Sequence, residues 1–239
     1  MVKLLSMKKA PFLVFIFVSF VFWAALSNAE VIKKETQGFK YCLFVPATYD
    51  ASRNWPLIIT FHPSTGSGSF MVERISEQAE KKCYIVAGPD SKDTRYWNFS
   101  EAKDVFRMLE EIKKDYRIDE KNIFLTGFSS GALMTYYMGL NYPEKFCGLA
   151  PFSGYLKRLE EENNVFLSRE ITKHIPVLIV HGKNDNVVNI GEAIYASERL
   201  KQFGYDVFLR ELGGLDHEYP SYVSWIIINW FEKIRRKND

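Results

Sequence analysis

Two hydrophobic patterns alternate along the chain, and their order predicts the fold class. Short continuous apolar runs are typical of strands buried on both faces of a parallel sheet, and longer segments with apolar residues three and four positions apart are typical of helices. The predicted strands are Phe39–Pro46, Leu57–Phe61, Tyr84–Ala87, Ile123–Leu125, Cys147–Phe152, Pro176–Val180 and Val207–Leu212. The predicted helices are Phe70–Lys82, Asp104–Tyr116, one that follows Gly131, Ile190–Phe203 and Tyr219–Arg235. This alternation predicts an α/β fold with a mostly parallel sheet and helices on both faces.

The first 29 residues have the pattern of an export signal rather than of a folded element. Lys3, Lys8 and Lys9 form a positive start, the apolar run Phe12–Leu26 follows, and Ser27-Asn28-Ala29 places small residues at a cleavage site. The apolar run is short for a membrane span, which needs about 20 residues. The sequence therefore predicts a signal peptide over 1–29 and one domain over 30–239, in a secreted or periplasmic protein. An uncleaved membrane anchor is the alternative.

Charge and cysteine content exclude several classes of partner. The whole chain carries a formal net charge of +2, and removal of the three signal-peptide lysines leaves 28 basic against 29 acidic residues. That balance gives no electrostatic reason to expect nucleic acid. Three cysteines do not make a disulfide framework, although Cys42 and Cys83 could pair if their strands are neighbours. No Cys or His pair has zinc-ligand spacing, so neither a metal nor a cofactor is expected.

The most informative motif is Gly127-Phe128-Ser129-Ser130-Gly131, between a predicted strand and a predicted helix. A G-x-S-x-G turn in that context is the nucleophile elbow of serine hydrolases. The turn is tight enough to strain the backbone of its serine, and the flanking glycines remove the Cβ atoms that would collide with it. The serine hydroxyl is then exposed at the positive end of the following helix. Ser129 is accordingly the candidate nucleophile.

A serine nucleophile needs a base within hydrogen-bond reach and a carboxylate that orients the base. Asp185 follows the predicted strand Pro176–Val180, and His217 follows Val207–Leu212. Because the carboxyl ends of parallel strands meet at one edge of a sheet, these side chains should lie near Ser129. Asp216 is a rival acid, but adjacent loop residues seldom present the required geometry. His181 is interpreted as a structural hydrogen-bonding residue.

An oxyanion hole needs two backbone N–H groups, one from the residue after the nucleophile and one from the loop after an early strand. Ser130 supplies the first. The loop that begins at His62 is the source of the second, and because Pro63 has no N–H, Ser64 is the predicted donor, with Thr65 as the alternative. A dinucleotide-binding interpretation of Gly66-Ser67-Gly68 fails because Met71 stands where the third glycine is needed.

The chain resembles the α/β-hydrolase superfamily, and within it the secreted carboxylesterases similar to polyhydroxybutyrate depolymerases and feruloyl esterases. The resemblance extends over most of residues 30–239, in the segments 41–46, 56–59, 96–99, 116–119, 142–146, 181–185 and 216–220 around the elbow. It implies an α/β-hydrolase fold, hydrolysis of carboxylic esters and a triad of Ser129, Asp185 and His217. Two departures are His62-Pro63, where the family usually has His-Gly, and the absence of the paired cysteines common in its depolymerase members.

The connection Ser153–His174 is too short to form a lid domain, so the site should be open to solvent. Trp97 and Phe99 are candidates for an aromatic substrate-binding wall. The predicted function is a secreted serine esterase that acts on short-chain, hydroxycinnamoyl or polyester substrates through an acyl-enzyme. The alternatives are an acyltransferase or serine peptidase with the same site and, from another class, a binding protein on a hydrolase scaffold. Membrane association is expected only if residues 1–29 are retained.

Overall fold

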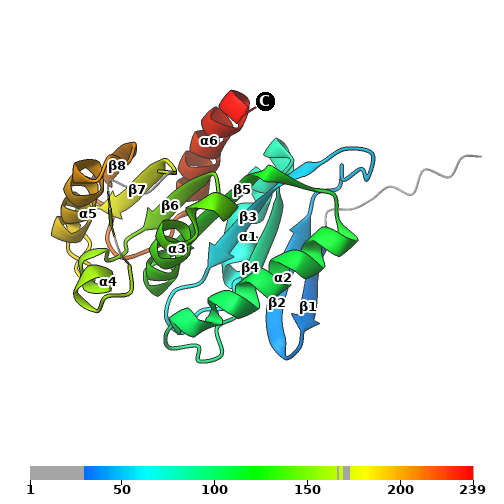
Figure 1. Cartoon of the computed structure of the whole chain (residues 1–239), viewed down its shortest axis with the longest axis horizontal. Helices are drawn as coiled ribbons and strands as arrows, with labels where there is room; N and C mark the ends of the chain where they lie inside the picture. Colours follow the sequence, from blue (N-terminus) through cyan, green and yellow to red (C-terminus); the bar gives the residue numbers. More distant parts are fainter. Residues whose placement is uncertain (1–29, 166, 169–172, 239) are drawn as a thin grey trace, which may run out of the picture.

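The computed structural model of the protein describes residues 30–165, 167–168 and 173–238 (Figure 1). Eight strands form one sheet in the order β1-β2-β4-β3-β5-β6-β7-β8. The strands are β1 (Glu30–Thr36), β2 (Phe39–Val45), β3 (Trp55–Phe61), β4 (Ile85–Pro89), β5 (Ile118–Phe128), β6 (Gly148–Phe152), β7 (Val177–Gly182) and β8 (Val207–Leu212). The predicted signal peptide and its cleavage site after Ala29 lie outside the described residues.

The sheet is parallel from β3 and β4 through β8, and antiparallel only where β2 pairs with β1 and with β4. The predicted α/β fold is therefore confirmed. The sequence analysis missed β1, which forms a hairpin with β2 through Gln37 and Gly38, both at positive φ (49° and 80°). β1 is an edge strand with an alternating, mostly polar sequence, so it lacks the continuous apolar run that marks the buried strands.

Helices cover both faces of the sheet, as Figure 1 shows for α2 and α3 in front of it and α1 behind it. The helices are α1 (Gly68–Lys82), α2 (Ala102–Asp115), α3 (Ser130–Asn141), α4 (Lys157–Glu161), α5 (Ile190–Gln202) and α6 (Ser221–Asn238), with short 3₁₀ turns η1 (Phe99–Glu101) and η2 (Pro143–Lys145). The buried residues of α2, α3 and α5 pack on one face, and those of α1 and α6 pack on the other. Among the described helices, none combines the length and apolar character needed to cross a bilayer.

The connection between β6 and β7 contains only the five-residue helix α4 within its described residues, so no lid domain is present there. α4 is fixed against α5 through Glu160, whose carboxylate accepts hydrogen bonds from Tyr195 Oη and Arg199 Nε, each at 2.9 Å. α4 is therefore held against α5 rather than free. Cys42, Cys83 and Cys147 are all free thiols, so the pairing considered for the first two does not form.

Candidate active site

Ser129 lies at the sharp turn between β5 and α3, with φ 55° and ψ −117°. This conformation is strained for a residue with a side chain, and the backbone packs closely on both sides of it. A Cβ atom on Gly127 would come within 2.3 Å of the Gly131 carbonyl oxygen, and one on Gly131 within 2.1 Å of the Phe61 carbonyl oxygen. Ser129 N also donates to the Phe152 carbonyl oxygen at 2.9 Å. The two glycines of the motif are thus needed for packing as well as for the turn.

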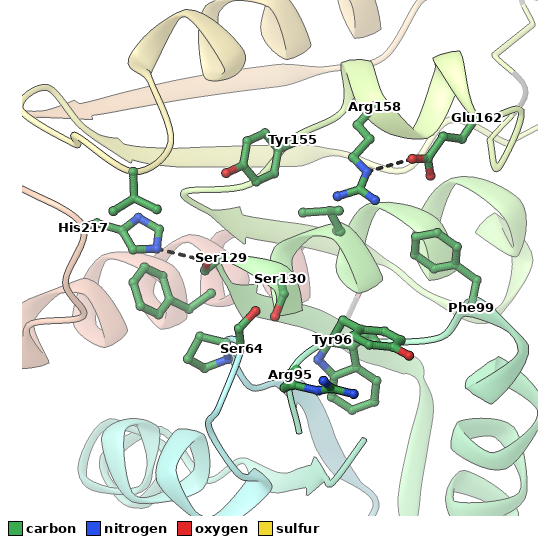
Figure 2. A pocket seen from close by; sticks show the side chains of 15 residues that line it. Ser64, Arg95, Tyr96, Phe99, Ser129, Ser130, Tyr155, Arg158, Glu162 and His217 are labelled. Carbon is green, nitrogen blue, oxygen red and sulfur yellow. Dashed lines mark hydrogen bonds and ion pairs between the residues drawn. The ribbon is translucent and has the colours of Figure 1, made fainter. Parts of the chain in front are cut away.

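The structure brings the three predicted triad residues together. Ser129 Oγ lies 3.0 Å from His217 Nε2, and His217 Nδ1 lies 2.8 Å from Asp185 Oδ2. Figure 2 shows the His217 ring pointing directly at Ser129 at one end of a pocket. Because Nδ1 faces a carboxylate, it donates, and Nε2 is left to accept the serine hydroxyl proton. This is the contact order that activates a serine nucleophile.

Asp185 is held as an ionised acceptor although its side chain is fully buried. Its Oδ1 accepts hydrogen bonds from the backbone N–H groups of Val187 and Val188, at 3.0 and 2.7 Å. Burial acts to raise the pKa of Asp185, but the Val188 N–H and the His217 ring outweigh it, and the pKa lies below its ordinary value. The carboxylate can therefore orient His217 and offset a positive charge on it.

The rival carboxylate, Asp216, connects two loops rather than orienting the His217 ring. Its Oδ1 accepts from the backbone N–H groups of Asn186 (3.1 Å) and His217 (2.7 Å), and its Oδ2 accepts from Asn186 Nδ2 at 3.0 Å. Asp216 therefore ties the loop after β8 to the loop after β7. It bonds to the backbone of His217, whereas Asp185 bonds to the ring.

His181 is a structural hydrogen-bonding residue, as predicted. It is fully buried, its Nε2 lies 2.7 Å from the Val188 carbonyl oxygen, and burial lowers its pKa. The neutral ring donates from Nε2 and stabilises the loop that carries Asp185. Among the described residues, no group of three His, Cys, Asp or Glu side chains could hold a metal ion.

The loop after β3 presents Ser64 to the pocket in a tight turn. The Pro63 carbonyl oxygen accepts from Gly66 N at 2.9 Å, and Thr65 has a positive φ of 61°. Thr65 N donates to the Thr94 carbonyl oxygen, so this N–H is already bonded. Among the described residues, neither Ser64 N nor Ser130 N has a hydrogen-bond acceptor, and both residues line the pocket (Figure 2). The geometry therefore favours Ser64 over Thr65 as the second oxyanion donor.

Trp97 and His62 hold this loop in place from below. Trp97 is only 6% exposed, and its Nε1 donates to the His62 carbonyl oxygen at 2.9 Å. The ring centroids of Trp97 and His62 lie 4.8 Å apart. His62 is fully buried, with Nδ1 donating to the Pro63 carbonyl oxygen (2.7 Å) and Nε2 accepting from Ser91 N (3.0 Å). Most of Trp97, predicted as a substrate contact, is thus used to pack against the Ser64 loop.

The aromatic residue that sequence analysis missed is Tyr96, whose side chain is 54% exposed at the pocket rim (Figure 2). Phe99, the other predicted substrate contact, also lines the pocket and stacks on Tyr137 with ring centroids 4.5 Å apart. One signal could have found Tyr96. In an extended loop, neighbouring side chains point to opposite sides, so an inward Trp97 implies an outward Tyr96.

The pocket at Ser129 is a cleft of about 640 Å³ between the loop that carries Tyr96 and the segment around α4. Arg158 extends over the cleft from α4 and pairs with Glu162, with 2.8 Å between Nε and Oε1. The full lining is Pro63, Ser64, Arg95, Tyr96, Trp97, Phe99, Phe128, Ser129, Ser130, Leu133, Tyr155, Arg158, Glu162, Val187 and His217. Its volume is typical of a site for a small ligand or one residue of a polymer.

A profile of the phospholipase/carboxylesterase family matches residues 92–233, which include the elbow and the loops of Asp185 and His217. The chain belongs to this family. Membership confirms the resemblance found in the sequence. The match begins after β3, so the Ser64 loop, where this chain departs from the usual His-Gly, lies outside it.

Several relatives of this carboxylesterase-family chain have described activities. A bifunctional acetylxylan esterase/xylanase of Neocallimastix patriciarum is 28% identical over 65% of the chain. A probable feruloyl esterase C of Aspergillus terreus is 27% identical over 69% of it. The chain spans only 23% and 62% of the length of these two relatives. Among solved structures, a ferulic acid esterase from Anaeromyces mucronatus has the same fold, with a TM-score of 0.68, 20% identity, and coverage of 82% of this chain and 87% of that one.

The buried histidines lead to a prediction about stability. Burial lowers the pKa of both His62 and His181, so below about pH 6.5 the unfolded chain binds more protons than the folded one and stability falls. We expect the melting temperature to be level near pH 8 and to drop towards pH 5. Each histidine contributes up to about 1.4 kcal/mol per pH unit to the free energy of unfolding. In scanning calorimetry, the melting temperature of a His62→Gln/His181→Gln variant should depend less steeply on pH. An unchanged slope of melting temperature against pH would show that these two histidines do not cause the loss of stability.

Proposed function

We propose that the protein is a secreted serine esterase that hydrolyses carboxylic esters through an acyl-enzyme. The observation that carries the proposal is the hydrogen-bonded chain Ser129–His217–Asp185 at the wall of an open cleft. Ser129 Oγ attacks the ester carbonyl carbon while His217 Nε2 takes the hydroxyl proton. Asp185 keeps the ring in the required tautomer and offsets its charge. The same proton then passes to the leaving alcohol, and the acyl group stays on Ser129.

In the second half of the reaction, water replaces the alcohol. His217 takes a proton from the attacking water, and the acid product leaves as the proton returns to Ser129 Oγ. In both halves the carbonyl oxygen becomes negative, and the N–H groups of Ser64 and Ser130 are the proposed donors to it. These donors are fixed before the substrate arrives, which is what makes such stabilisation effective.

The shape of the cleft supports esters with a short or flat acyl group. The described residues of the β6–β7 connection form one wall and no closed cover, so a long acyl chain would remain in contact with water and gain little. Tyr96 and Phe99 can stack on an aromatic acyl group or a sugar ring. The names of the relatives, acetylxylan esterase and feruloyl esterase, agree with both possibilities. We therefore propose acetyl, hydroxycinnamoyl or short polyester substrates.

A fluorophosphonate probe tests the proposal directly, because it labels only an activated serine. We expect labelling at Ser129, and no labelling when His217 is replaced by alanine. A panel of 4-nitrophenyl esters and peptide anilides then separates an esterase from a peptidase, and an added alcohol acceptor reveals acyl transfer. A protein that neither reacts with the probe nor cleaves any ester would be a binding protein on a hydrolase scaffold.

The cleft residues predict a specific pattern of substrate preference. Tyr96→Ala should lower kcat/KM for methyl ferulate about 3- to 10-fold, the size of one aromatic contact, and leave 4-nitrophenyl acetate nearly unchanged. Trp97→Ala should instead lower kcat for both esters, because Trp97 holds the His62 carbonyl beneath the Ser64 loop. Values of kcat/KM for acetyl, butyryl, feruloyl and palmitoyl esters would show which acyl group the cleft prefers. If the palmitoyl ester were best, the segment around α4 would have to close over the cleft.

We also propose that residues 1–29 direct the protein out of the cytoplasm, on the sequence pattern described above. Expression of the full chain in a bacterial host should then yield an exported protein whose first residue is Glu30. N-terminal sequencing identifies the first residue, and fractionation of the cells shows whether the protein is exported. Recovery in the membrane fraction with Met1–Ala29 intact would make the protein a tethered enzyme instead.

A further inference from the structure

A second cavity, of about 760 Å³, lies at the opposite edge of the sheet from Ser129. Lys121 lies near the start of β5, Cys147 directly precedes β6, Pro176 directly precedes β7, and Asp206 directly precedes β8. Since β5 to β8 are parallel, these positions define the edge where the strands begin, whereas Ser129 lies where β5 ends. The C-terminal end of α6 closes the cavity, far from α4 and the catalytic cleft in Figure 1. The cavity is therefore separate from the catalytic cleft.

Apolar side chains form the walls of this cavity. Ile175 and Pro176 come from the approach to β7, and Trp230 and Ile234 come from α6. Phe208, on the edge strand β8, is 52% exposed, and its ring lies edge-on to Trp230 with the centroids 6.5 Å apart. A single exposed apolar residue is not informative, but an apolar surface rimmed by polar residues is typical of a ligand-binding groove. The cavity can therefore hold an apolar group against the joint surface of Phe208 and Trp230.

The charged groups around the cavity are mostly of one sign. Among the residues that the structure describes, four lysines line it against a single carboxylate, that of Asp206. The lysines are Lys121, Lys173, Lys233 and Lys237. All four have exposed side chains, and Lys173 is positioned by a bond of 3.0 Å from its Nζ to the Phe146 carbonyl oxygen. The excess of positive charge attracts anions and disfavours cations. An apolar interior with a basic rim is complementary to an amphipathic anion.

Two other polar residues line the cavity, Cys147 and His174, and both already have partners within the protein. Cys147 donates its S–H to the Ile123 carbonyl oxygen at 3.3 Å, and burial raises the pKa of its thiol to about 12. It is thus a protonated, weakly reactive thiol. His174 packs its ring on Tyr205, with centroids 4.5 Å apart. The ligand is accordingly held by contact and charge alone.

We propose that this cavity is a binding site for an amphipathic carboxylate, with the apolar part against the rings of Phe208 and Trp230 and the carboxylate at Lys233 and Lys237. The cavity has the size of a small-molecule site, and its concave shape suits a single molecule better than a flat membrane surface. Carboxylates with an apolar part are also the acids that a carboxylesterase releases. The site is nevertheless independent of the proposed reaction, since it shares no residue with the catalytic cleft.

Calorimetric titration of the full chain with monomeric decanoate tests this site. We expect one decanoate per chain, and much weaker binding of decyltrimethylammonium, which has the same chain and the opposite charge. Lys233→Glu/Lys237→Glu should weaken decanoate binding at least tenfold, and Phe208→Ser several-fold. The matched control Lys40→Glu/Lys103→Glu makes the same charge change at two exposed lysines on β2 and α2 and should bind as the unmodified protein does. Because all four lysines are exposed, melting curves should show that both double variants fold.

Three results would overturn the proposal. Equal binding of the cation would exclude recognition of the carboxylate. Weakening by Tyr96→Ala, with no effect of the double lysine change, would place decanoate in the catalytic cleft. The third result is that the protein binds phosphatidylglycerol vesicles but not free decanoate, and that Lys233→Glu/Lys237→Glu abolishes vesicle binding. This edge of the sheet would then be a membrane-contact surface. None of these results depends on whether Ser129 is catalytic, so the site and the proposed function can fail separately.

Discussion

Ser129→Ala and His217→Ala are each expected to lower kcat for ester hydrolysis by about 10⁶-fold, and Asp185→Ala by about 10⁴-fold. The physical reason is the chain of contacts described above: the hydroxyl has no acceptor for its proton without His217, and the ring loses its orientation without Asp185. The double and triple variants should be little worse than the worst single one, because the three groups act as one unit. Steady-state rates with 4-nitrophenyl acetate measure all of these effects.

Asp216→Asn is the matched control for Asp185→Asn. Both positions carry a carboxylate on loops beside His217, but Asp216 bonds to backbone N–H groups and Asp185 to the ring. We expect Asp216→Asn to cost less than about tenfold in kcat, since an amide oxygen can still accept those bonds. Full activity in His217→Ala would contradict the assignment of His217 as the base. Equal losses of kcat in Asp185→Asn and Asp216→Asn would contradict the assignment of Asp185 as the acid that orients it.

Ser64→Pro is expected to lower kcat by about 10²–10³-fold, the cost of removing one oxyanion donor, whereas Ser64→Ala should be nearly neutral. The donor is the backbone N–H, which alanine keeps and proline lacks. Ser64 is the second residue of the turn Pro63–Gly66, a position at which proline is favoured, so the loop should keep its shape. KM should change little, because the charge on the oxygen develops in the transition state.

The control for this pair is the neighbouring residue. Thr65→Ala keeps an N–H that is already bonded to the Thr94 carbonyl oxygen, so it should have little effect on kcat. Equal and mild losses in Ser64→Pro and Ser64→Ala would remove Ser64 from the proposed oxyanion hole. Circular dichroism and melting temperature separate a lost donor from a loop that no longer folds.

The elements that position the candidate site could be predicted from the sequence because they are buried. β3, β5, β6 and β7 are continuous apolar runs, and each ends at the edge where Ser64, Ser129 and Asp185 lie. β5 is longer than predicted, because Asp119-Glu120-Lys121 near its start are polar and precede the apolar run that predicted the strand. β1 was missed for the same reason. Strand patterns in a sequence report burial, and these segments are strands without being buried.

The aromatic part of the cleft could not be predicted with the same success. Tyr96 and Trp97 are adjacent in one loop and chemically similar, and their exposures of 54% and 6% are set by a contact distant in sequence, from Trp97 Nε1 to the His62 carbonyl oxygen. Alternation along the loop places the two side chains on opposite sides, but a single sequence does not say which of them is buried. The second cavity was missed because its four lysines come from three separate segments that only the fold brings together.

The backbone at Ser129 sets a limit on how far this protein can be stabilised without loss of its proposed reaction. A side-chain residue at positive φ in such a turn costs roughly 1–3 kcal/mol, against a total stability of about 5–15 kcal/mol for a typical domain. Replacement by glycine would relieve that strain and remove the nucleophile in one step. A selection for heat resistance alone would therefore favour inactive chains at this position. Directed evolution of the protein must screen for turnover in every round, and thermal tolerance must be sought in elements remote from the elbow.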